Sequence, residues 1–496
     1  MRTGKHIITL LALAVSLGAT ACKNKNEKTK TPDGGSAVPS IPGTASQEAK
    51  EDFASVAARY KAAKDRGALS KGTCDELAGA FEGVYKKYGA QMAVAKFNAG
   101  AVWEECGDTE KAEKIYEALV RDVPKYDLAY NNLGVIYWNR KQESRALDFF
   151  KKAVDANATT RAPRNNLAAA LRNKYAESPQ QADFDAAEKQ LQNVLAVDSG
   201  NRLAYENLAR LYYDRGRLKD KSYLLLADLV TTQAIQVLKK ENIESADIFN
   251  IKGLLFMQED NQIEALRAFK KGVEINKNHT DAHMNIAMIA IRFRDYKAAE
   301  ESINVALKDQ RQKKNVEAYL GLGVALRGQR KYSDAETAFK RAQDLKGSDP
   351  RALYNLGILY HEHIGPATEA KTEGAFDKKP YEKAKDYFGK FVSQASGKKE
   401  LDRYAADAKS RITNIDDYFK NIEEMKKLEA EAAKLAELAK KQEDEEKARL
   451  RKMEEDLMKD QGGGSTPPPA EKKPDPAKPA DPAKPADKAA KPPKAS

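Results

Sequence analysis

Small and large hydrophobic residues recur along this chain at a nearly constant distance. The small residues of a first set are separated by 34, 34, 41, 44, 34, 36 and 34 positions, and they are Gly100, Gly134, Ala168, Ala209, Gly253, Ala287, Gly323 and Gly357. A large residue often follows three positions later, as at Trp103, Tyr137, Tyr212, Phe256 and Tyr360. A period of about 20 to 50 residues marks stacked repeats, so the pattern predicts a repeat architecture.

A second set of small residues accompanies the first. In most units it follows by 12 positions, and its members are Ala112, Ala146, Ala187, Thr231, Ala265, Ala299, Ala335 and Ala384. Each has a large apolar residue four positions later, namely Tyr116, Phe150, Leu191, Ile235, Phe269, Ile303, Phe339 and Phe388. Residues four apart lie on one face of a helix. Each unit is therefore expected to be two helices that approach closely at the small residue and pack against the large one.

This pattern resembles the tetratricopeptide repeat over eight units, from about Met92 to Gln394. The segments Tyr130 to Tyr137 and Leu353 to Tyr360 match that repeat well, and Pro124 closes the first unit. The resemblance implies an all-α, superhelical solenoid over residues 92–394. The sequence departs from the repeat by insertions of 7, 10 and 15 residues in the third, fourth and eighth units, around 173–181, 215–223 and 363–379.

The segments on both sides of the array lack the repeat pattern. Residues 47–91 are expected to form an N-terminal helical cap, because 47–66 and 73–88 read as helices and the end of a solenoid needs a polar outer face. Residues 395–460 are expected to form a capping helix, 400–419, and then a long charged helix. Its apolar stripe fits a short coiled coil or a protruding charged helix, and the small number of apolar heptads favours the second.

The two ends of the chain carry most of its excess charge. Of the formal net charge of +11, residues 1–46 contribute +4 from six basic and two acidic side chains, and residues 461–496 contribute +3 from seven Lys and four acids. A nucleic-acid binder should concentrate basic charge on its folded part, so no nucleic-acid partner is expected. Residues 461–496 also hold ten of the 19 prolines, which predicts an extended, disordered tail rich in Pro, Lys and Ala.

Residues 1–21 have the order of a secretory signal peptide, with a positive end, an apolar core and small residues. The apolar stretch Ile7–Ala21 has 15 residues, fewer than the roughly 20 that a spanning helix needs. The tetrapeptide that ends at Cys22 is similar to the lipobox of bacterial lipoproteins, which implies lipidation of Cys22 and a flexible linker over 22–46. Because Lys23 and not Asp follows, the resemblance implies the outer membrane, facing the periplasm. Ordinary Ala-x-Ala cleavage is the alternative.

Few residues carry candidate chemistry. Cys74 and Cys106 are either a disulfide of an exported chain or two buried thiols on neighbouring helices. The sequence has no nucleotide-binding loop, no nucleophile elbow and no His-Glu-x-x-His motif. His279 and His283 are four apart, but His279 precedes the predicted start of its helix, so no metal site is expected. The sequence predicts a non-enzyme without a cofactor.

One polar residue type recurs in register with the repeats. Two positions before the small residue, six units carry Asn98, Asn132, Asn166, Asn207, Asn285 and Asn355, and Asn250 is displaced by one position. The resemblance implies that this position faces the concave groove, where a carboxamide could pair with a peptide backbone. The same register places six further candidates for partner contact there, Trp138, Tyr213, Arg172, Arg210, Arg292 and Arg327. Local hydrogen bonding by Asn, and ordinary packing of the other six, are the alternatives.

These features favour a lipid-anchored scaffold that faces the periplasm and binds protein partners of a cell-envelope complex. Its layout is similar to repeat lipoproteins of the gliding-motility apparatus, which implies membership of an outer-membrane subcomplex. Two other functions are consistent with the same features. A pilotin-like factor would assist the assembly of an outer-membrane secretin, and a cell-wall regulator or tether would reach the wall through the basic, Pro-rich tail.

Overall fold

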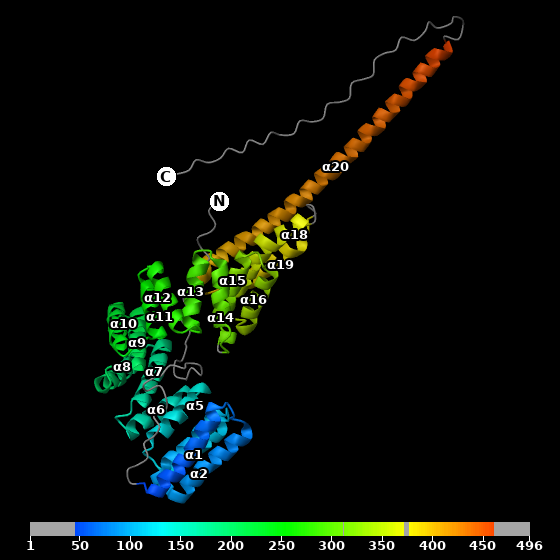
Figure 1. The fold of residues 1–496 in the computed structure, drawn as a ribbon. Helices are drawn as coiled ribbons and strands as arrows, with labels where there is room; N and C mark the ends of the chain where they lie inside the picture. The colour runs from blue at the N-terminus through cyan, green and yellow to red at the C-terminus, as the bar shows by residue number, and fades with distance from the viewer. Residues whose placement is uncertain (1–44, 311, 372–375, 461–496) are drawn as a thin grey trace. The chain divides into compact units, whose positions relative to one another are not determined.

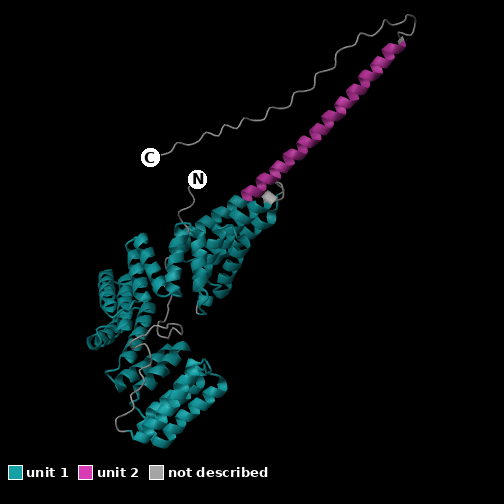
Figure 2. Cartoon of the chain, in the orientation of Figure 1, with its two compact units in different colours: residues 1–415 teal, residues 416–496 magenta. Residues whose placement is uncertain are grey.

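The computed structural model describes residues 45–310, 312–371 and 376–460, and the elements in these ranges are helices (Figure 1). The predicted signal peptide, Cys22, most of the linker and the Pro-rich tail lie outside the described residues. The chain divides into two compact units, residues 1–415 and 416–496 (Figure 2). No described helix is both long enough and apolar enough to cross a membrane.

The first compact unit consists mainly of paired helices. The cap is formed by α1 (Gln47–Asp65) and α2 (Lys71–Tyr88), and a short 3-10 turn, Gly89–Met92, leads into the repeats. The first helices of the eight repeats are α3 (Ala93–Glu105), α5 (Asp127–Asn139), α7 (Arg161–Glu177), α9 (Arg202–Leu218), α11 (Ala246–Gln258), α13 (Thr280–Arg292), α15 (Val316–Gly328) and α17 (Arg351–Leu359). Their second helices are α4 (Thr109–Asp122), α6 (Glu143–Ala156), α8 (Gln181–Val197), α10 (Ser222–Lys240), α12 (Gln262–Ile275), α14 (Tyr296–Ala306), α16 (Tyr332–Leu345) and α19 (Lys378–Ala395).

Each first helix meets its second helix at the predicted small residue. A Cβ atom added to Gly134 would lie 2.5 Å from the ring of Phe150, so only glycine leaves room for that ring. Glycine stands opposite a ring in five repeats, whereas the three repeats with alanine have Leu191, Ile235 or Ile303 as the large residue. The volume lost on one helix is thus matched by volume gained on the other, as dense packing requires. We call this the anchor contact.

Neighbouring repeats stack through their first helices. Contacts join α5 to α7, α7 to α9 and α9 to α11, and they also join α13 to α15 and α15 to α17. The buried side chains form two clusters, one from Ala45 to Ile289 and one from Ala287 to Leu359, and α13 contributes to both. The surface formed by the first helices is called the inner face below.

The insertions of the third and fourth repeats lengthen helices. There α7, α8 and α9 have 17 residues each and α10 has 19, whereas α5 and α6 have 13 and 14. In the eighth repeat, the chain after α17 forms a π-helical turn, Tyr360–Ile364, and then α18 (Gly365–Lys371). The described parts of the insertions are therefore mostly helical extensions and not open loops.

A disulfide joins the cap to the first repeat. It links Cys74 of α2 to Cys106, the C-cap of α3, and the two Cα atoms are 6.5 Å apart. Of the two sequence alternatives, the structure therefore has the bonded one. A cross-link between residues 32 positions apart restricts the unfolded chain and favours the folded state of this end of the array.

A continuous helix, α20 (Asp402–Asp460), replaces the expected capping helix and separate charged helix. The reason is local, because no Gly or Pro interrupts this stretch. In the second unit, the described side chains from Glu423 onward are exposed, and ion pairs four residues apart include Glu437 with Lys441 at 3.1 Å and Glu443 with Lys447 at 2.6 Å. Such pairs each add about 0.2–0.5 kcal/mol to an exposed helix.

The anchor contact predicts opposite outcomes for two glycine substitutions. Gly134→Ala forces a methyl group against the Phe150 ring and is expected to lower the free energy of unfolding by about 1–3 kcal/mol. Gly389→Ala in α19 meets no atom within 4 Å and is expected to raise it by about 0.5–1 kcal/mol. Urea unfolding followed by circular dichroism measures both, and equal effects of the two variants would contradict the contact.

Candidate functional site: the inner face of the array

The predicted Asn residues lie on first helices, and five of the six bond to the preceding repeat. The Nδ2 atom of Asn132 is 3.1 Å from Glu104 and 3.0 Å from the Tyr116 hydroxyl. The remaining bonds join Asn166 Nδ2 to Asn131 at 2.8 Å, Asn285 Nδ2 to Asn250 at 2.9 Å, Arg172 Nη1 to Asn207 at 3.1 Å and Arg327 Nη1 to Asn355 at 3.4 Å. Asn98 donates to the Val94 carbonyl of its own helix, at 2.8 Å.

These bonds fix the carboxamides without exhausting them. An Asn side chain has two donor hydrogens and two acceptor lone pairs, and each bond above uses one of them. All but Asn207 are only half-buried, so each of these five residues keeps part of its surface in contact with solvent. The inner face therefore presents carboxamides at a repeating position and in an orientation held by the neighbouring repeat.

Two of the residues that hold the carboxamides were not among the sequence candidates. Asn131 and Asn250 are buried and accept from the Asn of the following repeat. Asn131 could have been found from the doublet Asn131-Asn132, because Asn132 alone occupies the predicted position two residues before Gly134 and its neighbour is a second Asn without an assigned role. Asn250 carried the signal of a displaced Asn, because it stands three positions before Gly253 instead of two.

Most of the predicted Arg and aromatic candidates pack between repeats. Trp138, Tyr213, Arg172 and Arg327 are buried, whereas Arg292 is exposed with Nη2 3.4 Å from Asp260. Burial lowers the pKa of Arg172 to about 10 and also lowers the pKa of Arg327. The four buried side chains thus belong to the packing beneath the inner face, and their contribution to binding is indirect.

Charged side chains gather on the inner face of α9, α11 and α13. We call this group the charged sector, and it consists of Glu206, Arg210, Asp214, Asp247 and Asp281. Arg210 Nη2 lies 3.6 Å from Asp281, and the buried Nη1 atom of Arg210 has no hydrogen-bond partner. Glu206 accepts from the Ser245 hydroxyl at 2.6 Å and lies 2.7 Å from Arg202.

Burial is the largest single influence on the pKa values of Glu206, Asp214 and Asp247 in the charged sector. It raises the pKa of Glu206 to about 7, against the opposing charge of Arg202 and with help from the charge of Asp247. Burial likewise raises the pKa of Asp214, although Arg210 and Arg172 oppose it. Burial also acts to raise the pKa of Asp247, but the hydrogen bond and charge of His279 hold that pKa below its usual value.

His279 and His283 serve the protein's own structure. His279 is the N-cap of α13, and its Nδ1 atom accepts from the Ala282 amide at 3.0 Å while Nε2 faces Asp247 at 3.4 Å. His283 Nε2 lies 3.0 Å from the Lys277 carbonyl. Within the described ranges, no group of three His, Cys, Asp or Glu side chains is placed to hold a metal ion.

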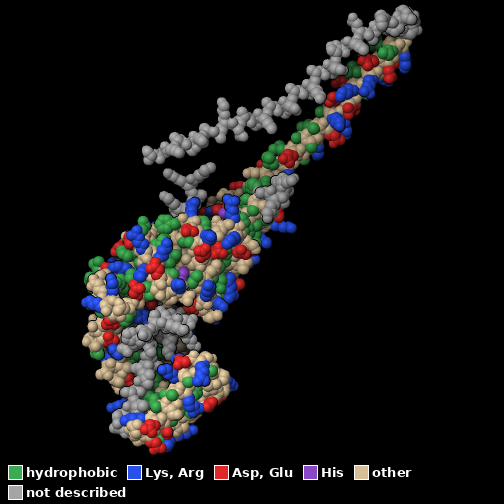
Figure 3. Space-filling view, viewed as in Figure 1, with side chains coloured by type: hydrophobic (Ala, Val, Ile, Leu, Met, Phe, Trp, Pro, Cys, Tyr) green, Lys and Arg blue, Asp and Glu red, His purple; other side chains and the backbone are tan. Residues whose placement is uncertain are grey.

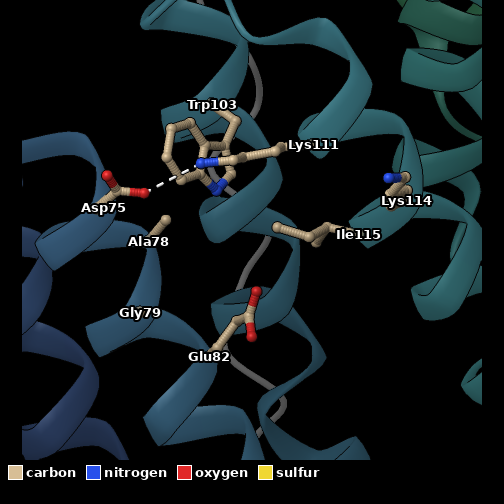
Figure 4. A pocket seen from close by; sticks show the side chains of 8 residues that line it. All are labelled: Asp75, Ala78, Gly79, Glu82, Trp103, Lys111, Lys114 and Ile115. Carbon is tan, nitrogen blue, oxygen red and sulfur yellow. Dashed lines mark hydrogen bonds and ion pairs between the residues drawn. The ribbon is translucent and has the colours of Figure 1, made fainter. Parts of the chain in front are cut away.

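A pocket of about 310 Å³ lies near the disulfide, between α2, α3 and α4 (Figure 4). Its apolar wall includes Trp103 and Ile115. Lys111 Nζ stands 3.6 Å from the centre of the Trp103 ring and 3.0 Å from Asp75. The lysine is thus already engaged by a cation–π contact and an ion pair. The pocket offers no arrangement of nucleophile, acid and base.

Paired helices stacked through an inner face of polar side chains define a helical-repeat scaffold of the kind that binds other proteins. The fold is a solenoid of tetratricopeptide-like helical repeats, and the model of the tetratricopeptide repeat matches residues 106–160, 180–220 and 320–370. The human Tetratricopeptide repeat protein 6 is 42% identical over 57 residues, which cover 12% of this chain and 11% of that protein. The human Protein O-mannosyl-transferase TMTC3 is 21% identical over 271 residues, which cover 47% of this chain and 29% of that protein.

This chain thus spans less than a third of the length of these curated relatives. Among solved structures, pilF of Pseudomonas aeruginosa is 19% identical, with a TM-score of 0.36 over 46% of this chain and 94% of that one. PilW, a type IV pilus biogenesis factor, is 18% identical, with a TM-score of 0.35 over 48% of this chain and 97% of that one.

The raised pKa of Glu206 predicts a pH dependence. Its folded value of about 7 exceeds the ordinary 4.5, so the folded chain binds this proton more tightly than the unfolded chain. The stabilisation is complete below pH 4.5 and is lost as the pH rises through about 7. In the native chain, the free energy of local unfolding of α9 and α11 should change with pH by up to about 3 kcal/mol, and Glu206→Gln should abolish this change. Hydrogen–deuterium exchange of both chains at matched pH values measures it, and identical pH profiles would contradict the assignment.

Proposed function

We propose that the inner face binds an extended segment of a partner protein and that the chain thereby assembles a machine of the cell envelope. The observation that carries this proposal is the bonding of successive Asn side chains to the preceding repeat. Groups that are already held in one orientation lose little conformational entropy when a partner binds. The inner face is therefore preorganised at several successive repeats.

An extended peptide matches this arrangement chemically. Its backbone offers a donor and an acceptor at every residue, and each carboxamide offers both in return. Because the same group recurs from repeat to repeat, recognition through it does not depend on the partner's side chains. The charged sector would add selectivity at α9 to α13, where its acidic and basic side chains could pair with charged groups of a partner.

The cellular setting of the proposal comes from the N-terminal sequence. A signal peptide followed by Cys22 supports a lipid anchor and an envelope location, in the outer membrane and facing the periplasm. An anchor raises the local concentration of the scaffold near envelope partners. The gliding-motility apparatus is the machine whose repeat lipoproteins have a similar layout. The identity of the captured partner distinguishes it from secretin assembly and from a cell-wall tether.

Two pairs of variants separate binding from stability. Asn166→Ala and Asn285→Ala each remove an inter-repeat hydrogen bond together with a carboxamide of the inner face. The matched controls Asn131→Ala and Asn250→Ala remove the same bonds from the other side and leave that carboxamide in place. Asn131→Ala also removes the 3.3 Å bond from Asn131 Nδ2 to Asn132. All four variants should lose about 0.5–1.5 kcal/mol of stability per bond. In-cell crosslinking with mass spectrometry should show the partner captured by the native chain and lost from the Asn166→Ala, Asn285→Ala double variant. The controls should capture it more weakly than the native chain, because their carboxamides are present but no longer held in one orientation.

Two results would count against the proposal. Capture that survives in the double variant would place the function away from the carboxamides. Equal loss from the double variant and the controls would show that the bonds matter for folding alone.

The proposed lipid anchor at Cys22 has its own test. Cys22→Ala should move the protein from the membrane pellet to the soluble fraction and abolish its labelling by a palmitate analogue in cells. Unchanged labelling would rule out Cys22 as the modified residue. A soluble native protein with an N-terminus at Cys22 would instead indicate ordinary signal cleavage.

A further inference from the structure

An outward-facing part of α10 exposes a cluster of leucines. Leu225, Leu226 and Leu229 are 71%, 40% and 65% exposed. The other large apolar side chains exposed in the described part of residues 1–415 are Val197, Ile263 and Phe293, which are far apart in the sequence. A lone exposed apolar residue is ordinary, whereas a group within two helical turns is typical of an interaction surface.

This part of α10 is firmly attached to the array. The Tyr223 ring packs edge-on against the rings of Phe184 and Tyr212, with centroids 5.3 and 5.7 Å away. The guanidinium of Arg215 lies 4.5 Å from the centre of the same Tyr223 ring. Leu224 packs against Gly216, where an added Cβ atom would lie 2.6 Å from the leucine side chain. The leucines on the opposite side of α10 are thus presented by a rigid support.

The stretch of α10 that holds the leucines also carries little charge. Between Ser222 and Leu238 the single side chain that is charged at neutral pH is Asp228, and Lys252 Nζ lies 2.5 Å from it. Basic and acidic side chains are interspersed over the face of the molecule that Figure 3 shows. The neutral stretch on α10 is therefore unusual in a chain in which 32% of residues are charged.

Basic residues stand at the end of α10 nearest the leucines. Lys219 and Lys221 are exposed in the connection from α9. Asp220, which lies between them, accepts from the Ser222 amide at 3.0 Å and from its hydroxyl at 2.7 Å. These bonds hold Asp220 in its ionised form, so the two lysines and this one acid leave a net charge of +1 on the connection. Leu225, Leu226 and Leu229 together with Lys219 and Lys221 are called the α10 patch below.

We propose that the α10 patch docks on an anionic lipid surface. Exposed leucines on a rigid helix enter the boundary between head groups and acyl chains, and adjacent lysines contact lipid phosphates. The leucines of the patch thus match the apolar part of such a surface, and the lysines match its phosphates. A second copy of the chain fits less well, because a two-fold axis through the leucines would bring the lysines of the two copies close together. The proposal is independent of the inner face.

Fluorescence quenching by brominated acyl chains tests whether a leucine of the patch enters the bilayer. The probe is a vesicle of phosphatidylethanolamine and phosphatidylglycerol with brominated chains, and the protein is the full chain carrying Leu229→Trp. The native Trp103 and Trp138 are buried and give a constant background. Ile263→Trp is the matched control, since Ile263 is 65% exposed, as is Leu229.

We expect the fluorescence of the Leu229→Trp variant to be quenched and that of the Ile263→Trp variant to be unchanged. Attachment of the chain through a lipidated Cys22 alone does not produce this difference, because both variants share the anchor. Replacing phosphatidylglycerol by phosphatidylcholine should raise the lipid concentration needed for half-maximal quenching by about tenfold. Introducing Lys219→Glu with Lys221→Glu should have the same effect.

Four results would overturn the proposal. The first is absence of quenching in the Leu229→Trp variant on vesicles that carry the protein. The second is equal quenching of the two variants. The third is a dimer in sedimentation velocity that Leu225→Glu with Leu229→Glu dissolves, which would assign the patch to a second copy. A protein captured at the patch without quenching would assign it to a protein partner.

Discussion

The anchor contact between the two helices of each repeat is the interaction on which the rest of the structure depends. It brings the helices together where a glycine faces a ring, as at Gly134 and Phe150, or where an alanine faces a shorter side chain. Burial of the large residue stabilises each helix pair by hydrophobic transfer and by dispersion contacts. The contact also fixes how far each first helix is rotated, because the small residue must point at its partner. That rotation decides which side chains reach the inner face.

The anchor contact and the inner face are physically connected in the first two repeats. The hydroxyl of the anchor residue Tyr116 donates to Glu104 at 2.6 Å and accepts from Asn132 at 3.0 Å. A buried polar group is costly unless it is bonded, so the hydroxyl requires partners on the inner face. Asn132 therefore stabilises the junction between repeats and remains half-exposed. The same dual role of structure and surface applies to Asn166 and Asn285, and it explains why matched controls are needed to separate the two.

The lengthened fourth repeat concentrates the unusual features of the array. Its first helix, α9, carries Glu206 and Arg210 of the charged sector, and its second helix, α10, carries the exposed leucines. The extension is stabilised by the guanidinium of Arg215, which contacts the rings of both Phe184 and Tyr223, 4.4 and 4.5 Å from their centres. The lengthened repeat thus has a polar inner side and an apolar outer side. The two sides serve the two separate contacts proposed here, one with a protein and one with a lipid surface.

The sequence by itself determined the period, the helix pairs and the identity of the anchor residues, because these follow from spacings of three, four and about 34 residues within short segments. Only the tertiary structure decided that Arg172 and Trp138 are buried between repeats, that Asn131 holds Asn166, and that burial raises the pKa of Glu206. These outcomes depend on the angle at which one repeat stacks on the next. Contacts between residues some 35 positions apart set that angle, and no local pattern encodes it.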